Sequence, residues 1–384
     1  MERIERAAVL LALAGLVGGC GLPAPRAGIV GERIVVQARH HAPIAVIDGH
    51  TGDKVFVASG DGLVDGAPTD GRLVFLHGDG GLYARDISSG TVAWRVFTKI
   101  DYAARAVVTK KAVFVPVEGL LGSEGLMREA PPPVWAGFKK DTGEHVLDLA
   151  CDAGAPLATN DDILVTFEHA ELVGYNAEDG KERWRSTLAG VRPPVLVSGG
   201  FLYARVDDEE IGSFNAASGA LREKVKLGGT DAFSGFLGTQ PHVAATGGTL
   251  VWIEGGALHA ADGESGKELW SHAGVEVMTV GDGAAYVAVG KDLAALDLAT
   301  GTERWKLTLA KSLENLSAGQ GAVAARVSGD EVIVIDAATG KVRFGFDLAA
   351  GARAPDEDGG ARGARGHRRQ QILHRPNARI GRHG

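Results

Sequence analysis

A short turn motif recurs eight times along the 384-residue chain, and this repetition constrains the fold more than any other feature. The motif reads Asp/Asn-x-x-Thr/Ser/Asp-Gly, and an aromatic residue usually follows its glycine by four positions. Successive motif glycines are 38, 53, 37, 39, 47, 35 and 39 residues apart. A period near forty indicates one small supersecondary unit that is repeated. The motif glycines are Gly52, Gly90, Gly143, Gly180, Gly219, Gly266, Gly301 and Gly340.

Each copy of the motif joins two short runs of strand-like sequence. The clearest example is residues 331–336 and 341–348, in which apolar side chains alternate on either side of the turn at Gly340. Two alternating runs joined by a short glycine turn predict a β-hairpin. An Asp or Asn that opens the turn can accept a hydrogen bond from the backbone N–H two residues on. Glycine then tolerates the positive φ that closes the turn.

Further strand-like runs precede each hairpin, such as residues 248–254 and 284–289. A unit of about four strands has the size of a propeller blade, and no long helical period follows residue 20. The sequence therefore predicts an all-β fold, an eight-bladed β-propeller. Seven blades are the alternative, because few residues precede the first motif to supply a full blade. Residues 28–36 could provide a strand that closes the ring by pairing with the last blade.

Aromatic residues are concentrated at the fourth position after the motif glycine, where four of the six tryptophans of the chain occur. In this pattern the chain resembles the PQQ-like (quinoprotein-type) β-propeller repeat family, whose repeat is written A-x-D-x-x-[TS]-G-x-x-x-W. The resemblance spans roughly residues 33–349. It implies that these aromatic side chains pack between neighbouring blades and lock them together. The aromatic residues at this position are Phe56, Trp94, Trp184, Trp270, Trp305 and Phe344, and the two exceptions are Leu147 and Glu223.

The N-terminus carries an apolar run at residues 7–17, which predicts the core of a signal peptide because it is too short to span a membrane as a helix. The following residues, Val17-Gly18-Gly19-Cys20, resemble the bacterial lipobox, which implies lipidation of Cys20. Gly21 at the next position implies sorting to the outer membrane. An ordinary secretory signal or an uncleaved anchor is the alternative. Several lipid chains would anchor the protein stably, since each buried methylene contributes about 0.8 kcal/mol.

These features divide the chain into a signal peptide at 1–19, a linker or closing strand at 20–32, the propeller at 33–349 and a tail at 350–384. The tail carries eight arginines and three acidic residues without an apolar period, so we expect it to be disordered. It is either a solvated extension or a contact to anionic lipid or another envelope polyanion. The formal net charge of the chain is −8, which argues against a nucleic-acid-binding protein.

Catalytic signatures are missing from the sequence, which has neither a Gly-x-Ser-x-Gly elbow nor a Gly-x-x-x-x-Gly-Lys-Ser/Thr phosphate loop. Quinone-dependent dehydrogenases resemble the chain in repeat type, but they use a pair of adjacent cysteines that this chain does not have. The pair His40-His41 is a poor metal site, because neighbouring strand residues point to opposite faces. The acidic residues of 59–71 lack the spacing of a calcium loop, and Asp-Gly turns explain them better. We therefore predict a non-enzyme without metal or cofactor.

Two insertions interrupt the regular period and are the best candidates for contact with a partner. They occupy residues 119–133 and 228–241, within the steps of 53 and 47 residues. Large apolar side chains in these insertions would be costly to leave exposed. They either fold back over a face of the propeller or contact another envelope protein. The candidate contact residues are Leu120, Leu121, Leu126, Met127, Phe233 and Phe236.

The combination of lipid anchor, repeat type and size is similar to the propeller lipoprotein family of the outer-membrane β-barrel assembly machinery (the BAM complex). The resemblance implies a protein-binding scaffold that docks on the assembly complex, with edge-strand pairing to incoming barrel proteins as a further option. A periplasmic ligand-binding or sensory propeller outside that complex is the alternative. A quinone-dependent dehydrogenase is the least favoured interpretation. No residue-specific docking motif of that family is found in the chain, so the functional expectation depends on architecture.

Overall fold

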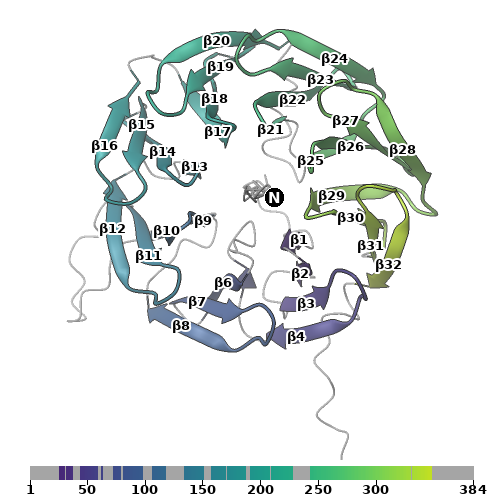
Figure 1. The fold of residues 1–384 in the computed structure, drawn as a ribbon, viewed down its shortest axis with the longest axis horizontal. Coiled ribbons are helices and arrows are strands. Elements are labelled where there is room, and N and C mark those ends of the chain that lie inside the picture. Colours follow the sequence, from purple (N-terminus) through teal and green to yellow (C-terminus); the bar gives the residue numbers. More distant parts are fainter. Residues whose placement is uncertain are drawn as a thin grey trace, which may run out of the picture. The chain divides into compact units, whose positions relative to one another are not determined.

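The computed structural model describes residues 26–347 apart from several gaps, and all of these residues belong to the unit Met1–Arg353. The described residues contain strands and turns but no helix, in agreement with the predicted all-β fold. The strands form eight four-stranded sheets that follow one another around a central axis as the blades of a propeller (Figure 1). The gaps are residues 31, 38–43, 59–61, 64–71, 79–80, 98–105, 118–133, 151–156, 170, 187–190, 208, 228–242 and 330.

Each blade uses four consecutive strands in chain order, and every pairing is antiparallel. The first strand of a blade lies toward the centre and the fourth lies at the rim (Figure 1). The strands of the first four blades are β1 (Arg26–Val30), β2 (Arg33–Gln37), β3 (Ile44–Asp48) and β4 (Lys54–Ala58); β5 (Gly62–Leu63), β6 (Leu73–Gly78), β7 (Gly81–Asp86) and β8 (Val92–Phe97); β9 (Val107–Val108), β10 (Ala112–Val117), β11 (Val134–Lys139) and β12 (His145–Ala150); β13 (Ala158–Thr159), β14 (Ile163–Glu168), β15 (Glu171–Asn176) and β16 (Glu182–Arg185).

The last four blades have the same organisation, with longer innermost strands than blades two to four. Their strands are β17 (Arg192–Ser198), β18 (Phe201–Arg205), β19 (Glu210–Asn215) and β20 (Leu221–Lys226); β21 (Val243–Thr246), β22 (Thr249–Glu254), β23 (Ala257–Asp262) and β24 (Glu268–Ala273); β25 (Val277–Gly281), β26 (Ala284–Val289), β27 (Asp292–Asp297) and β28 (Glu303–Thr308); β29 (Leu313–Gly319), β30 (Ala322–Val327), β31 (Glu331–Asp336) and β32 (Val342–Asp347).

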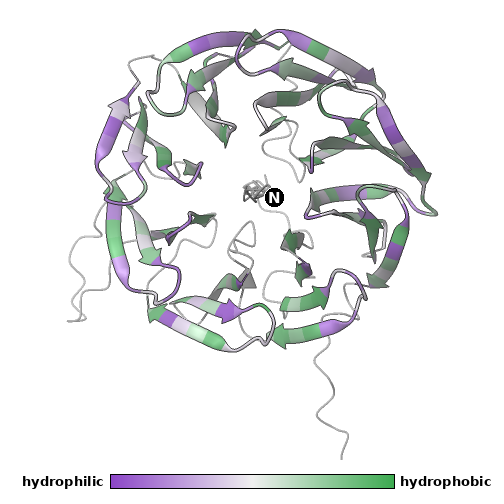
Figure 2. Ribbon diagram, viewed as in Figure 1, coloured by the Kyte–Doolittle hydropathy of each residue, from purple (hydrophilic) through white to green (hydrophobic). Residues whose placement is uncertain are grey.

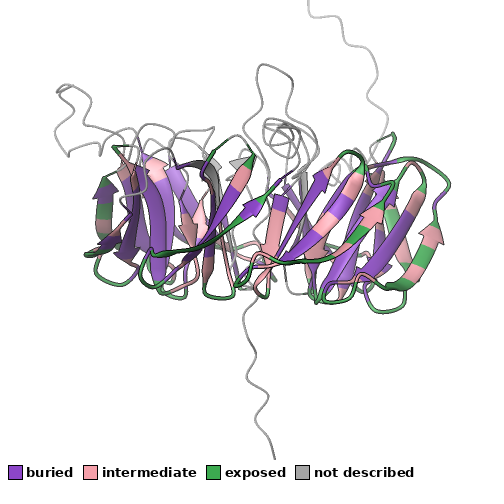
Figure 3. Cartoon of the chain, turned by 90° about the horizontal axis from the view of Figure 1, so that it is seen from above, coloured by how far each residue is buried: buried purple, intermediate pink, exposed green. Residues whose placement is uncertain are grey.

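The core of the propeller lies between blades, because the second and third strands of each sheet are apolar on both faces. These strands are hydrophobic in Figure 2 and buried in Figure 3, whereas the outer strands are more polar and more exposed. Strand β26, for example, is buried from Ala284 to Ala288. One face of a blade packs on the preceding blade and the other on the next, so the apolar runs are nearly continuous. Burial of these faces from water is the main stabilising contribution to the fold.

The repeated motif forms the turn between the third and fourth strands of every blade. In the first copy, the Asp48 Oδ1 atom accepts hydrogen bonds from the backbone N–H groups of His50 at 2.9 Å and Thr51 at 3.0 Å. The N–H of Gly52 then donates to the carbonyl oxygen of Asp48 at 2.9 Å. All eight motif glycines have φ between +65° and +79°, a conformation that other residues adopt only at a cost. In the third copy Lys139 takes the place of the acid or amide.

The motif glycine of each blade lies directly against the fourth strand of the preceding blade. A Cβ atom on Gly340 would lie 2.7 Å from the ring of Trp305, a distance at which no side chain fits. The indole Nε1 of Trp305 also donates to the carbonyl oxygen of Ala337, three residues before that glycine, at 2.8 Å. The same indole bond joins Trp94 to Lys140, Trp184 to Ala216 and Trp270 to Leu298. Ring contacts with the next motif glycine are made by Phe56, Trp94, Trp184, Trp270, Trp305 and Phe344.

Two of the eight blade junctions depart from this aromatic contact. Leu147 covers Gly180 between the third and fourth blades, and Glu223 covers Gly266 between the fifth and sixth. At the second of these junctions Tyr203 is fully buried, and its hydroxyl donates to the carbonyl oxygen of Gly248 at 3.1 Å. A tyrosine from the middle of the fifth blade therefore contributes ring burial at a junction whose motif position is polar.

The ring closes without exchange of a strand between the first and last blades, contrary to the expectation for residues 28–36. These residues lie in the β1–β2 hairpin, and β2 pairs with β3 of the same blade. The last blade is completed by its own β29–β32. The first sheet also begins at Arg26, before the expected propeller boundary at residue 33. Apolar residues of β1–β3 pack against apolar residues of β30 and β31, so side-chain packing closes the core across this junction.

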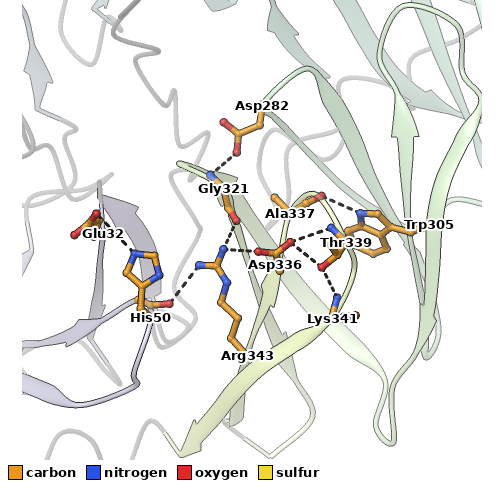
Figure 4. A network of polar contacts seen from close by, with 11 residues as sticks. Glu32, His50, Asp282, Trp305, Gly321, Asp336, Ala337, Thr339, Lys341 and Arg343 are labelled. Carbon is orange, nitrogen blue, oxygen red and sulfur yellow. Dashed lines mark hydrogen bonds and ion pairs between the residues drawn. The ribbon is translucent and has the colours of Figure 1, made fainter.

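A polar network supports this closing junction (Figure 4). The Arg343 guanidinium donates to Asp336 at 2.7 Å, to the carbonyl oxygen of Gly321 at 2.7 Å and to the carbonyl oxygen of Gly49 in the first blade at 3.4 Å. The ring of Phe344 covers Gly52, as the equivalent aromatic residues do elsewhere. The closing junction therefore repeats the contact used between consecutive blades, with an added arginine bond.

Replacement of Trp184 by alanine should lower the free energy of unfolding by about 3–5 kcal/mol, because a ring that is 8% exposed would leave a cavity beside Gly219. Trp184→Phe should cost less, since it keeps most of the ring and loses the indole hydrogen bond to Ala216, worth about 1 kcal/mol. Urea unfolding followed by tryptophan fluorescence and circular dichroism measures both. Equal losses for the two variants would contradict a role for ring packing.

Acid should weaken the propeller through its motif aspartates. Hydrogen bonds from Arg343 and Thr339 hold the pKa of Asp336 at about 2, and Arg304 and Thr300 do the same for Asp297, against an ordinary value of 3.8. Because the folded pKa values are lowered, their stabilisation is complete above about pH 4 and is lost as pH falls through about 2. The melting temperature should therefore fall between about pH 5 and about pH 2. An Asp336→Asn variant should have a lower melting temperature than the unmodified protein at about pH 5, and its melting temperature should fall less between about pH 5 and about pH 2. A fall as large as that of the unmodified protein would refute this role of Asp336.

Candidate interaction surfaces

The residues that the sequence singles out for partner binding lie outside the described part of the structure. This applies to Cys20, to the six apolar residues of the two insertions, to the pair His40-His41 and to the tail. The strands on either side nevertheless determine where the insertions leave the propeller. One insertion joins β10 to β11 inside the third blade, and the other joins β20 to β21 between the fifth and sixth blades. Because strands alternate in direction, the described strand ends that flank both insertions lie on the face opposite the motif turns.

Among the described residues, no group of three or more His, Cys, Asp or Glu side chains is placed to hold a metal ion. Within the same residues, no helix is long and apolar enough to cross a membrane.

A cluster of four charged side chains joins β14, β15 and β16 of the fourth blade. The Arg185 guanidinium donates to Glu168 at 2.5 Å, Glu182 at 2.9 Å and Glu171 at 3.3 Å. The hydrogen bond from Arg185 holds the pKa of Glu168 below its usual range. Burial, together with the neighbouring charge of Glu168, raises the pKa of Tyr175 to about 12. The Glu168 carboxylate is therefore ionised and the Tyr175 phenol is protonated at neutral pH.

The outer strands differ strongly in polarity around the ring. Charged residues occupy most of β20, at Arg222, Glu223, Lys224 and Lys226. The outer strands of the first three blades, β4, β8 and β12, each contain a single Lys, Arg, Asp or Glu. In Figure 2 these three strands are predominantly hydrophobic, whereas β16, β20 and β28 are largely hydrophilic. The outer strands of blades one to three are therefore the most apolar sector of the described rim, although β24 also carries a single charge, Glu268.

The exposed apolar side chains of this sector are most prominent on β8. Phe97 is 69% exposed and Val92 is 47% exposed. The one charged group of the strand, the Arg95 guanidinium, lies 4.2 Å from the centre of the Phe97 ring and 4.7 Å from that of Tyr83. Sequence analysis did not single out these residues. An alignment of the eight repeats on their motif glycines contains the signal, because Phe97 occupies the position of Lys226 in the fifth blade.

Comparison with known protein families gives one extensive match. A family profile described as outer membrane protein assembly factor BamB matches residues 133–274 and 289–366, which is more than half of the chain. A protein of that name from Yersinia pestis is 27% identical over 172 residues, covering 40% of this chain and 43% of the Yersinia protein. The chain therefore matches less than half the length of that relative.

Solved structures share the fold at low sequence identity. The crystal structure of BamB from Moraxella catarrhalis covers 80% of this chain and 96% of its own, with a TM-score of 0.52 and 13% identity. Dihydro-heme d1 dehydrogenase NirN, in complex with DHE, covers 87% of this chain and 80% of its own, with a TM-score of 0.56 and 16% identity. The computationally designed protein Ika8 has a TM-score of 0.57 at 14% identity, covering 81% of this chain and 95% of its own. At these identities the likeness establishes the propeller fold alone.

Proposed function

The chain belongs to the family described as outer membrane protein assembly factor BamB, and on this premise we propose that it is a non-catalytic, protein-binding scaffold that assists the assembly of outer-membrane β-barrel proteins. In this proposal the protein is anchored to the outer membrane through lipid on Cys20 and faces the periplasm. Its partners are the subunits of the barrel-assembly complex. The family match over more than half of the chain is the observation that carries the proposal.

The use of the repeated residues supports a scaffold. The motif aspartates and asparagines accept hydrogen bonds within the turns. The motif glycines leave room for a side chain of the preceding blade, and the indole N–H groups donate to backbone carbonyl oxygens of the next blade. These residues are thus engaged in holding the ring together, which leaves the loops of the opposite face and the rim for partners. A scaffold needs no proton donor or nucleophile, and the charged cluster at Arg185 contains carboxylates already paired with a guanidinium.

Two other functions remain as outcomes of the test. A ligand-binding or sensory propeller would use its central funnel and would not associate with the assembly complex. A dehydrogenase is named among the structures of similar fold, but that likeness is at 16% identity and carries the fold only. The adjacent cysteines that quinone-dependent dehydrogenases use are also missing from this sequence.

Crosslinking of the full-length protein in its native envelope should recover subunits of the barrel-assembly complex, identified by mass spectrometry. The Cys20→Ser variant is the control, because loss of the lipid should release the protein from the membrane fraction and reduce the recovery. A preparation from native membranes that contains no assembly subunits would contradict the proposal. Such a result would favour the ligand-binding alternative.

The insertion at 119–133 is expected to contribute to partner binding. Replacement of Leu120, Leu121 and Met127 by serine should abolish co-purification of the partner and leave the circular dichroism spectrum unchanged. Serine at Phe233 and Phe236 is the matched variant for the other insertion, and it identifies which insertion the partner contacts. Loss of the folded spectrum instead of loss of the partner would mean that the apolar residues cover the propeller itself.

A further inference from the structure

The lipid-bearing Cys20 of the proposed function is separated from Arg26, the first residue of β1, by five residues, two of which are prolines. The six residue steps from Cys20 to Arg26 span at most about 22 Å when the chain is fully extended. Because the acyl chains of a lipidated cysteine enter the bilayer, the backbone of Cys20 lies at the membrane surface. In the anchored protein the start of the first blade is therefore held within about 22 Å of that surface.

The direction of β1 decides which face of the propeller this short tether holds near the membrane. Arg26 pairs with Gln37 at one end of the β1–β2 hairpin, and Val30 pairs with Arg33 at the other end. Arg33 also pairs with Asp48, the residue that opens the motif turn of this blade. Arg26 therefore lies at the end of the blade opposite the motif turns.

The length of the strands opposes contact of the motif face with the membrane. Strands β7 and β8 have six residues each, and a strand of this length spans about 20 Å. With the motif turns on the membrane, the tether would use nearly its whole reach to pass along one blade. The face opposite the motif turns is therefore the one that lies nearest the lipid.

The rim of that face carries an exposed aromatic side chain in the second blade. Phe97 is 69% exposed and ends β8, where it pairs with Gly81 at the end away from the motif turn. The same position in the sequence, the seventh after the motif glycine, is Lys226 in β20, on the opposite side of the ring (Figure 1). Phe97 is the one large apolar residue at this position. The other blades have Ser59, Ala150, Thr187, Ala273, Thr308 and Asp347 there.

The surroundings of Phe97 suit the boundary between lipid headgroups and acyl chains. The Arg95 guanidinium lies 4.2 Å from the centre of the Phe97 ring. At a bilayer surface an aromatic ring enters the apolar boundary, and an arginine keeps its charge at the level of the headgroups. The outer strands β4, β8 and β12 each contain a single Lys, Arg, Asp or Glu, so little charge is desolvated when this sector approaches lipid.

We propose that the anchored propeller lies against the phospholipid surface with the face opposite its motif turns, tilted so that blades one to three contact the lipid through Phe97. The tether decides the face, and the exposed aromatic side chain decides the sector. The inference rests on the lipid at Cys20, which is part of the proposed function. The positions of Arg26 and Phe97 in the fold are independent of that function.

The test uses the full-length lipidated protein in vesicles of phosphatidylethanolamine and phosphatidylglycerol, with Cys151→Ser to remove the other cysteine. A fluorescent label is attached to a new cysteine at Ala150 or at Ala273. Both residues are exposed, and both occupy the seventh position after the motif glycine, in the blades that follow those of β8 and β20. Nitroxide-bearing lipid should quench the label at residue 150 more strongly than the label at residue 273.

The variant Phe97→Lys, Lys226→Phe is the matched control, because it exchanges the side chains of the two blades at the same position. It should reverse the order, so that the label at residue 273 is the more strongly quenched. Its melting temperature should be unchanged, since both positions are exposed. Cys20→Ser should reduce the quenching at both labels, because the protein then has no lipid to hold it at the vesicle.

Stronger quenching at residue 273 than at residue 150 in the protein that keeps Phe97 would overturn the proposal. An order that the exchange of side chains leaves unchanged would overturn it too. Equal quenching at the two labels would also overturn it, and if crosslinking in the native envelope still recovers the assembly subunits, only this inference fails. Mass spectrometry of the N-terminal peptide separates the remaining case, because a Cys20 without lipid would overturn the anchor of the proposed function together with this inference.

Discussion

The structure depends on one contact, in which a motif glycine of each blade lies against a side chain four residues after the motif glycine of the preceding blade. Each contact is local to two blades, yet eight of them in series form a ring. The glycine has two independent reasons to be there: a positive φ near +70° and the absence of space for a Cβ atom beside the ring. One residue type thus satisfies the turn and the blade junction together, so substitutions at these positions disturb both.

Closure of the ring follows from the same contact. Many closed architectures need a strand from one end of the chain to complete the sheet at the other end. Here Phe344 covers Gly52 and Arg343 bonds the carbonyl oxygen of Gly49, so the last blade docks on the first as any blade docks on the next. The apolar core then continues across the junction without a shared sheet. Because the closing energy comes from side-chain packing, it is subject to the same substitutions and the same acid sensitivity as the other junctions.

The two faces and the rim of the propeller therefore carry residues with different roles. Motif residues on one face are used in turn and junction contacts. The strand ends on the other face flank the connections that vary in length, and the rim carries eight outer strands with different charge. A repeat architecture permits this variation because each outer strand contacts only its own blade and the next one. The contrast between β8 and β20 shows how two copies of one unit acquire different surfaces while their buried residues keep the same roles.

The sequence by itself determined the all-β fold, the propeller and the positions of the turns. These properties follow from local alternation and from a period near forty, both of which are visible without contacts. The packing of the aromatic residues between blades was implied by the resemblance to the PQQ-like repeat, and the structure confirms it. Only the tertiary structure decided how the ring closes, that Tyr203 supports the junction where Glu223 replaces an aromatic residue, and that Arg95 lies over two rings on β8. Those features depend on which residues from different repeats or strands become neighbours, and a repeat pattern assigns the same neighbours to every copy.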